Sequence, residues 1–200
     1  LTTTITDELR LATNFRSKVY GIALKDRGSI LPAGHLANAA YWYNDKTGRF
    51  TTSNYYKDQN MAWLQAFNDR NTGDSLLKLN WPLLYPDAEY TESTADDNNY
   101  ERAYKGAQKP VFPHRFDSLS DKERRSILKG TPAGNTYTIL MAEACIKGAQ
   151  LGMSKETDFL AVSLSSTDYV GHQFGPNSLE VEDMYQRLDQ LHRNQQCHCR

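Results

Sequence analysis

The sequence predicts an α/β fold in which parallel strands and flanking helices form part of a core, with an irregular cap region inserted. Two compact apolar runs, residues 19–24 and 159–164, have the length and β-branched content of strands buried in a parallel sheet. Helical patterns precede the first run and follow the second, as in α/β proteins. Residues 57–113 are rich in Asn, Asp, Tyr, Pro and Trp, which is typical of a lobe inserted over a site.

Length, composition and charge exclude several classes of protein. Two hundred residues can bury a sizeable core, and 39% hydrophobic with 24% charged residues is typical of a globular domain. No apolar run approaches the roughly 20 residues that cross a bilayer. The 23 basic and 24 acidic residues give a net charge of -1, so neither nucleic acid nor a membrane is an expected partner.

The first elements follow from local signals. Thr6 is the predicted N-cap of a helix, with Asp7 and Glu8 in the first turn, where the helix dipole favours acidic side chains. The strand at 19–24 follows and stops abruptly at the charged residues 25–28. A helix followed by a buried strand with charge at its carboxyl end is the pattern of an α/β unit.

A hairpin and one helix are predicted in the middle of the chain. Aromatic and Thr residues flank Asp-Lys-Thr-Gly at residues 45–48, which predicts two strands joined by a four-residue turn. Inside the irregular region, "NMAWLQAFNDR" at residues 60–70 predicts a helix.

The later helices carry capping signals. Ser120 and Glu123 form a predicted capping box. Asn135 is the predicted cap of a longer helix that closes at Gly152, and Ser178 begins the last helix, after the second strand.

These elements divide the chain into four predicted parts. Residues 1–53 and 118–190 are segments of the α/β core, and residues 54–117 form the inserted cap. Residues 191–200 do not continue the helical spacing of apolar residues, so we interpret them as a tail that is frayed or not native to the fold.

The three cysteines do not form a disulfide framework. Cys145 lies in an apolar helical pattern and is interpreted as a small buried residue. Cys197 and Cys199 could chelate a metal, although a C-x-C at a chain end lacks the paired spacing of zinc sites. The chain has no start methionine, signal peptide or targeting motif, and we expect an internal fragment or a processed product.

Polar side chains follow both predicted strands. Ligands of open α/β sheets bind beyond the carboxyl ends of strands. Lys25 and Arg27 follow the first strand, and in an extended segment they would point to one side, with Asp26 opposite. Two such cations form an electrostatic clamp for phosphate, because Arg can bind two oxygens at once.

Asp168 and His172 follow the second strand, in a predicted loop rich in small residues. A carboxylate and a neutral imidazole suit zinc, and the four-residue separation would let both turn towards one ion. Gly171 would permit the bend.

Structural interpretations of these residues stay open. An Asp-x-x-x-His pair is also a common hydrogen-bonded loop pair, and Lys-Asp-Arg is also a common solvated charge cluster. His35 is interpreted as tying down a loop through its ring nitrogens, whereas His114 has no partner that the sequence reveals.

Two long motifs resemble those of a known family. "GIALKDRGSILPAGHLANAAYW" and "SLSSTDYVGHQFGPNS", joined by "GTPAGNTYT", look like the alkaline phosphatase superfamily. The nearest branch is the type I phosphodiesterase/nucleotide pyrophosphatase group, and within it the bacterial zinc-dependent alkaline phosphatases with a Thr nucleophile. The resemblance covers residues 1 to about 190, and the motifs occur in the same order.

The resemblance implies a two-zinc hydrolase of phosphate esters in the periplasm or outside the cell. It assigns Asp168 and His172 to one zinc, and Lys25 and Arg27 to the phosphoryl group, where they favour monoesters. Two metals about 4 Å apart would stabilise the attacking and leaving oxygens of an in-line displacement.

Several functional residues of the family pattern have no match in this chain. The family's nucleophilic Thr and a metal-binding Asp belong upstream of Leu1, and its Asp-His pair and last His belong beyond Arg200; the chain contains no Asp-His dipeptide. One zinc would keep two protein ligands, fewer than the three typical of a catalytic site. We therefore expect the 200-residue chain to be inactive and to bind zinc weakly.

Two alternatives and one assembly hypothesis accompany this interpretation. The parent protein could be a phosphodiesterase or nucleotide pyrophosphatase of the same superfamily, or the chain could be a non-catalytic binding domain. A core that lacks sheet strands would expose edges and apolar faces, so we also expect a homo-oligomer that covers them.

Overall fold

The computed structural model describes residues 2–56 and 62–196 of the chain. The chain forms two compact units, each built from two segments. The first comprises Leu1–Gly73 and Tyr137–Ser165, and the second comprises Asp74–Thr136 and Ser166–Arg200.

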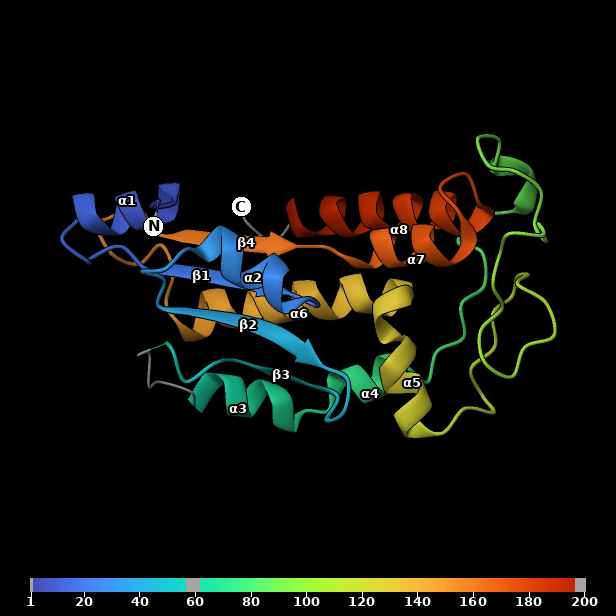
Figure 1. Ribbon diagram of the computed structural model, residues 1–200, viewed down its shortest axis with the longest axis horizontal. Helices are drawn as coiled ribbons and strands as arrows, with labels where there is room; N and C mark the ends of the chain where they lie inside the picture. Colours follow the sequence, from blue (N-terminus) through green and yellow to red (C-terminus); the bar gives the residue numbers. More distant parts are fainter. Residues whose placement is uncertain (1, 57–61, 197–200) are drawn as a thin grey trace. The chain divides into compact units, whose positions relative to one another are not determined.

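The first unit is built on a four-stranded sheet with the order β3-β2-β1-β4 (Figure 1). Its strands are β1 (Val19–Ala23), β2 (Ala39–Asn44), β3 (Arg49–Thr51) and β4 (Phe159–Ser163). β1 pairs in parallel with both β2 and β4, and only the short β3 runs antiparallel. The predicted α/β fold with mostly parallel strands is confirmed.

Helices cover both faces of this sheet. All five residues of β1 are buried, and α2 (Asp26–Ala33) packs against β1, β2 and β4. A Cβ at Gly21 would come within 2.1 Å of the carbonyl oxygen of Ser29, so α2 rests directly on the β1 backbone. Gly21 pairs with Ala40, so Ala40 lies on the face that α2 covers. Side chains alternate along a strand, so Tyr43, three positions later, faces away from α2. On that opposite face its ring lies 6.1 Å from that of Tyr137 in α6 (Pro132–Gly148).

Several local predictions are confirmed in this unit. Asn44 pairs with Arg49, so residues 45–48 form the four-residue hairpin turn. The helix predicted from "NMAWLQAFNDR" is α3 (Ala62–Asp69). The predicted start of the long helix is wrong, because α6 begins at Pro132, and Asn135 lies inside its first turn.

The second predicted strand is present but is not buried. Phe159 is 40% and Val162 37% exposed, since β4 pairs with β1 and with no other strand in the described part of the chain. β4 is therefore an edge strand with an apolar sequence. The predicted oligomer that would cover such an edge stays a prediction.

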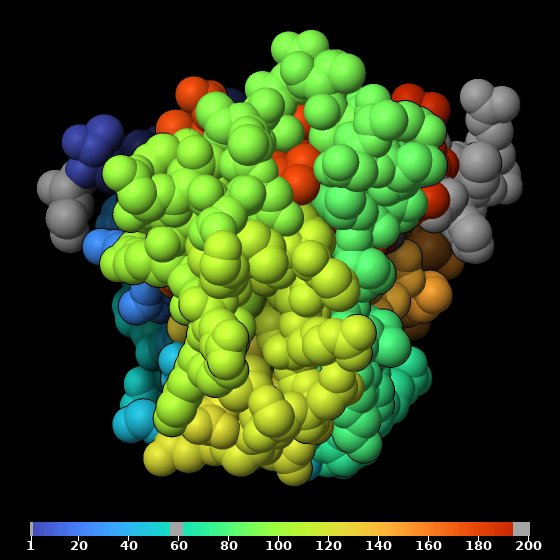
Figure 2. Space-filling view, turned by 90° about the vertical axis from the view of Figure 1, so that its right-hand side faces the viewer, coloured from blue at the N-terminus to red at the C-terminus, as the bar shows by residue number. Residues whose placement is uncertain are grey.

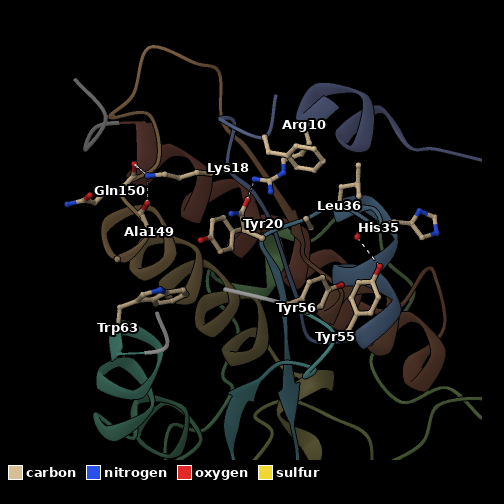
Figure 3. Close-up of a pocket in the computed structure, with 14 residues that line it drawn as sticks. Arg10, Lys18, Tyr20, His35, Leu36, Tyr55, Tyr56, Trp63, Ala149 and Gln150 are labelled. Carbon is tan, nitrogen blue, oxygen red and sulfur yellow. Dashed lines mark hydrogen bonds between the residues drawn. The ribbon is translucent and has the colours of Figure 1, made fainter. Parts of the chain in front are cut away.

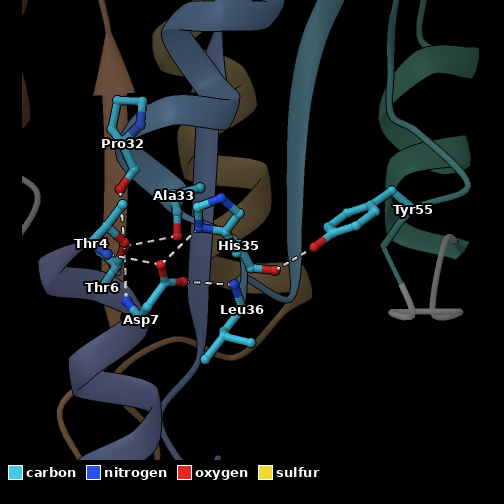
Figure 4. A network of polar contacts seen from close by, with 8 residues as sticks. All are labelled: Thr4, Thr6, Asp7, Pro32, Ala33, His35, Leu36 and Tyr55. Atoms are coloured by element: carbon cyan, nitrogen blue, oxygen red, sulfur yellow. Dashed lines mark hydrogen bonds and ion pairs between the residues drawn. The ribbon is translucent and has the colours of Figure 1, made fainter. Parts of the chain in front are cut away.

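The N-cap of α1 (Ile5–Ala12) is Thr4 and not Thr6, because Thr4 forms a reciprocal capping box with Asp7. Thr6 is buried and donates its hydroxyl to the carbonyl oxygen of Ala33 at 2.8 Å (Figure 4). This bond ties α1 to the end of α2.

The Asp7 carboxylate is the centre of that network. It accepts hydrogen bonds from the backbone N–H groups of Thr4 (2.9 Å) and Leu36 (2.7 Å), and His35 Nδ1 lies 3.2 Å away. Burial alone would raise the pKa of Asp7, but the hydrogen bonds from Thr4, Leu36 and His35 outweigh it and lower the pKa to about 2.

The second unit contains an irregular segment between short helices and a helical pair. Its elements are η1 (Asp87–Glu89), α5 (Asp121–Ile127), η2 (Leu128–Gly130), α7 (Ser166–Phe174) and α8 (Leu179–Gln196), with most of α4 (Thr72–Leu76). The predicted capping box of Ser120 and Glu123 is confirmed, and Ser178 Oγ accepts the N–H of Val181 at the start of α8. Figure 2 shows the irregular segment in green and yellow, with orange and red atoms of α7 and α8 visible between its loops.

The core of the second unit is aromatic and contains two buried acids. His114 Nε2 lies 3.0 Å from Glu180 Oε1, both side chains 1% exposed. Burial raises the pKa of Glu180. Asp183 is fully buried and accepts from Trp81 Nε1 (2.6 Å), Tyr90 Oη (2.6 Å) and Arg187 Nε (2.5 Å).

The two compact units do not coincide with the four predicted parts. Residues 54–73 belong to the first unit, although they were expected in the cap, and residues 118–136 belong to the second. That residues 54–117 act as an inserted cap stays a prediction. α8 continues to Gln196, so helical structure extends into the predicted tail, and residues 197–200 lie outside the described residues.

Two glycine-to-alanine substitutions should have opposite effects. Gly21→Ala should lower the free energy of unfolding by about 1–3 kcal/mol, because the new Cβ overlaps the Ser29 carbonyl. Gly171→Ala should raise it by about 0.5–1 kcal/mol, since Gly171 lies within α7 and its Cβ would meet nothing closer than Val181 Cγ2 at 3.9 Å. Urea unfolding measures both values, and equal effects would contradict the close packing of α2 on β1.

Asp7→Asn should lower the free energy of unfolding at pH 7 by about 2 kcal/mol, the equivalent of the lowered pKa. A carboxyl whose pKa is depressed by folding stabilises the protein above its unfolded pKa. The wild-type advantage should therefore be full above about pH 5 and disappear between about pH 4 and 2. Asp189→Asn, at an exposed pair with Arg193, is the control and should change stability by less than about 1 kcal/mol. A pH-independent difference would show that the charge of Asp7 is not the stabilising feature.

Candidate functional site

Lys25 and Arg27 lie at the start of α2, directly after β1. Lys25 is the N-cap residue with extended backbone angles (φ -100°, ψ 137°), and Arg27 lies in the first turn beside Asp26. The prediction that residues 25–27 form an extended segment is therefore wrong. The chain turns into α2 within two residues of Ala23 because that helix packs back onto β1, and the two cations are not related by strand alternation.

The chemistry of this helix start suits an anion. Lys25 is partly buried and Arg27 is exposed. The N-terminus of a helix carries a partial positive charge and unpaired backbone N–H groups. One of these groups, the N–H of Arg27, bonds to Asp26 Oδ1 at 2.7 Å, which offsets part of the charge. Two cations and the helix terminus together still favour an anion with more than one negative charge.

Asp168 and His172 lie on one face of α7, not in a loop. Asp168 Oδ1 and His172 Nε2 are 3.4 Å apart, as expected for residues separated by one helical turn. The Asp168 side chain is 52% and that of His172 76% exposed. Gly171 is helical, so the predicted bend at this glycine is wrong. The structure therefore brings these two side chains together through helix periodicity.

This pair fits part of a zinc site. A carboxylate oxygen and an imidazole nitrogen are ordinary zinc donors, and their exposure leaves room for an ion and further ligands. No group of three or more His, Cys, Asp or Glu side chains able to hold a metal occurs within residues 2–56 and 62–196. The described residues supply two ligands, which alone do not make a catalytic zinc centre.

Long-range contacts that the sequence did not reveal hold α7 at both ends. Asn135 Oδ1 accepts the N–H of Ser166 (3.2 Å) at the first residue of the helix. Arg102 Nη2 donates to the carbonyl oxygen of His172 (2.8 Å), and Gln173 Nε2 donates to that of Arg102 (2.8 Å). These partners are 31 to 71 residues apart in sequence, so no local pattern could identify them.

The two predicted pairs belong to different compact units. Lys25 and Arg27 belong to the first compact unit, and Asp168 and His172 belong to the second. Their convergence on one phosphate stays a prediction.

The remaining histidine and cysteine predictions concern residues outside the two pairs. His35 contacts Asp7 through Nδ1, as its interpretation as a loop tie requires, and Cys145 is buried. Cys197 and Cys199 lie outside the described residues. In the part of the chain that the structure describes, no helix has the length and apolar character needed to cross a membrane.

Comparisons with known proteins identify strong similarities. The family model for type I phosphodiesterase/nucleotide pyrophosphatase matches residues 17–194. The chain is 54% identical over 189 residues to the alkaline phosphatase PhoV of Synechococcus elongatus, covering 94% of the chain and 34% of PhoV. It also resembles the crystal structure of wild-type alkaline phosphatase PafA, with 49% identity and a TM-score of 0.87, covering 94% of the chain and 36% of PafA.

A second PafA structure carries four substitutions and matches with 47% identity, a TM-score of 0.89 and the same coverage. In that variant a Thr, an Asn, a Lys and an Arg are replaced, and the Lys and Arg stand two positions apart. The chain spans about a third of the length of these relatives.

Removing the α7 pair should barely affect folding. Asp168→Asn and His172→Gln should each change the free energy of unfolding by less than about 1 kcal/mol, because exposed charge pairs contribute little. Urea unfolding of both variants without metal tests this. A loss of several kcal/mol would favour the structural interpretation, in which the pair exists to hold the helix.

Proposed function

The chain belongs to the type I phosphodiesterase/nucleotide pyrophosphatase family, and from this premise we propose that it is part of a metal-dependent hydrolase of phosphate monoesters. The observation that carries the proposal is the Lys-x-Arg pair at the N-terminus of α2, directly beyond the carboxyl end of β1. Ligands of open α/β sheets bind in this position.

Lys25 and Arg27 are proposed to bind the phosphoryl group. The PafA variant with a replaced Lys and Arg supports this, since its two residues have the spacing of Lys25 and Arg27. The phosphoryl oxygens of a phosphate monoester carry up to two negative charges, whereas those of a diester carry one. Two cations at a helix N-terminus therefore favour the monoester dianion, with Arg27 able to bind two oxygens.

Asp168 and His172 are proposed to hold one zinc ion. Bound zinc would polarise the ester and neutralise charge on the reacting oxygens. The role of these two side chains is to orient an ion on the exposed face of α7, where Asn135 and Arg102 hold the helix ends. The resemblance assigns the nucleophilic Thr and the remaining metal ligands to segments that this chain does not contain.

The strands that precede the two pairs in the sequence end at the same edge of the sheet. β1 and β4 pair in parallel, with Ala23 opposite Ser163, so their carboxyl ends lie at the same edge of the sheet. Lys25 follows Ala23 by two positions and Asp168 follows Ser163 by five, so each pair comes shortly after one of these strand ends in the sequence.

A phosphodiesterase is the second candidate, since the family model itself describes phosphodiesterases and nucleotide pyrophosphatases. The two differ in the charge of the preferred substrate, and the relative rates on a monoester and a diester separate them. A non-catalytic domain would show neither activity in any longer protein that contains this chain.

The 200-residue chain should bind zinc weakly and should not hydrolyse p-nitrophenyl phosphate. Two ligands supply about half the binding free energy of a four-ligand site, which corresponds to a Kd on the order of 0.1 mM. Calorimetric titration measures this value in a Cys197→Ser, Cys199→Ser background, which removes the terminal thiols. His172→Gln should abolish the signal; zinc-dependent hydrolysis by the chain alone would overturn the assignment of the nucleophile to another segment.

A chimera tests the phosphate-binding role. Replacing the matching third of PafA by this chain should retain hydrolysis of p-nitrophenyl phosphate. In that background, Lys25→Ala or Arg27→Ala should lower kcat/KM for the monoester by about 10²–10³, the usual cost of one preorganised donor. Hydrolysis of bis-p-nitrophenyl phosphate should fall by less than about ten-fold, because the diester has less charge to bind.

Lys46→Ala, at an exposed residue of the hairpin turn, is the matched control and should leave both rates unchanged. Equal losses on monoester and diester would contradict the proposed preference for monoesters.

A further inference from the structure

The first unit contains a cavity of about 860 Å³ that the proposed function does not use (Figure 3). Lys18 and Tyr20 line it at the amino end of β1, whereas Lys25 follows the carboxyl end of the same strand. The five residues of β1 separate these ends by roughly 16 Å. We infer that this amino-end cavity binds an aromatic anion, a molecule that combines a ring with an acidic group.

The charge of the lining favours an anion. Arg10, Lys18 and His35 line the cavity, and no Asp or Glu is among its lining residues in the described part of the chain. The His35 ring is paired with Asp7. Arg10 and Lys18 instead bond to neutral acceptors: Arg10 Nη1 donates to Ser17 O (2.6 Å) and Asn38 Oδ1 (2.7 Å).

Lys18 has the same kind of neutral partners. Its Nζ donates to the carbonyl oxygens of Ala149 (2.7 Å) and Gln150 (3.0 Å), which follow the end of α6. An ammonium group has three donors, so one remains for a ligand. Within the described residues neither side-chain cation bonds to a carboxylate, although Asp158 Oδ1 accepts the backbone N–H of Lys18 at 2.7 Å, so the two cations give the cavity a positive potential.

Aromatic rings form much of the remaining lining. Trp63 packs so closely on α6 that a Cβ at Gly148 would come within 2.3 Å of its indole, and its ring meets Tyr41 edge-to-face at 5.2 Å. Tyr55 and Tyr56 line another side with their rings 5.3 Å apart, and Tyr55 donates its hydroxyl to the carbonyl oxygen of His35. Rings held by such contacts offer preformed faces and edges for stacking.

Size and lining together define the ligand class. The volume lies within the usual range of small-molecule sites, where apolar and aromatic walls bind the ligand and a few charged groups orient it. A purely apolar ligand would leave Arg10 and Lys18 without a counter-charge. A small inorganic anion would leave the rings unused. An aryl sulfonate, an aryl phosphate or a nucleotide satisfies both features.

Calorimetric titration of the 200-residue chain with naphthalene-2-sulfonate tests the inference, because a sulfonate cannot be hydrolysed as a phosphate ester. We expect a Kd of about 0.1 mM for a ligand of this size. Naphthalene-2-methanol, which lacks the charge, and methanesulfonate, which lacks the ring, should bind at least about ten-fold more weakly. Absence of sulfonate binding, or equal binding of the neutral analogue, would overturn the inference.

Asn38→Asp is the most specific variant. Asn38 Oδ1 accepts both Arg10 Nη1 and the N–H of Val19 (2.8 Å), so the isosteric carboxylate retains both bonds and adds a negative charge beside Arg10. Binding of naphthalene-2-sulfonate should weaken by about five-fold or more while the fold is maintained. Asn177→Asp makes the same change at an exposed residue outside the lining and should leave Kd unchanged.

Two further variants separate this cavity from the proposed phosphate site. Trp63→Leu should abolish binding by removing an aromatic wall. Lys25→Ala should not change it, because Lys25 does not line the cavity. If Lys25→Ala removed binding and Asn38→Asp did not, the sulfonate would be occupying the proposed phosphate site and the inference would fail.

Discussion

The packing of α2 on the backbone of β1 is the constraint on which the first unit depends. Gly21 has no side chain, and the Ser29 carbonyl occupies the space that a Cβ would need. Because the helix lies so close to its strand, the chain reverses within two residues of Ala23, and Lys25 becomes the first residue of the reversal. The position of the basic pair is thus set by the packing of α2 on the sheet and not by the extended segment that the sequence predicted. The same strand separates two regions of different character: a helix N-terminus with cations at one end and an aromatic cavity at the other.

Elements with a strong local signal were predicted well. β1 is a continuous apolar run, the hairpin turn has Asp, Lys, Thr and Gly between aromatic strands, and the capping box of Ser120 and Glu123 is contained in four residues. The loop predicted around Asp168 was wrong because Ser, Thr and Asp favour both loops and first turns of helices. The bond between Asn135 and Ser166 belongs to the tertiary structure, and such a contact decides between these conformations only after folding.

Local sequence patterns could not predict which polar groups are buried. Glu180 stands 66 positions from His114, and Asp183 accepts from Trp81 and Tyr90, 102 and 93 positions away. In the sequence these acids belong to a charged helix start and look like solvated residues. Their burial is compensated by donors from the irregular segment, which has little regular secondary structure of its own. That segment is therefore ordered by fixed carboxylates on α8 as well as by its aromatic side chains.

Of the candidate site, the residue types were predictable from the sequence, but the helix that aligns Asp168 with His172 was not.

The outer edge of β4 defines where the sheet can grow. Phe-Leu-Ala-Val-Ser contains neither proline nor a charged side chain, although Asp158 directly precedes it, and its outer N–H and C=O groups have no strand beside them in the described part of the chain. An apolar strand with an unpaired edge is a template for a further strand, so β4 is the position at which another stretch of polypeptide would extend the sheet.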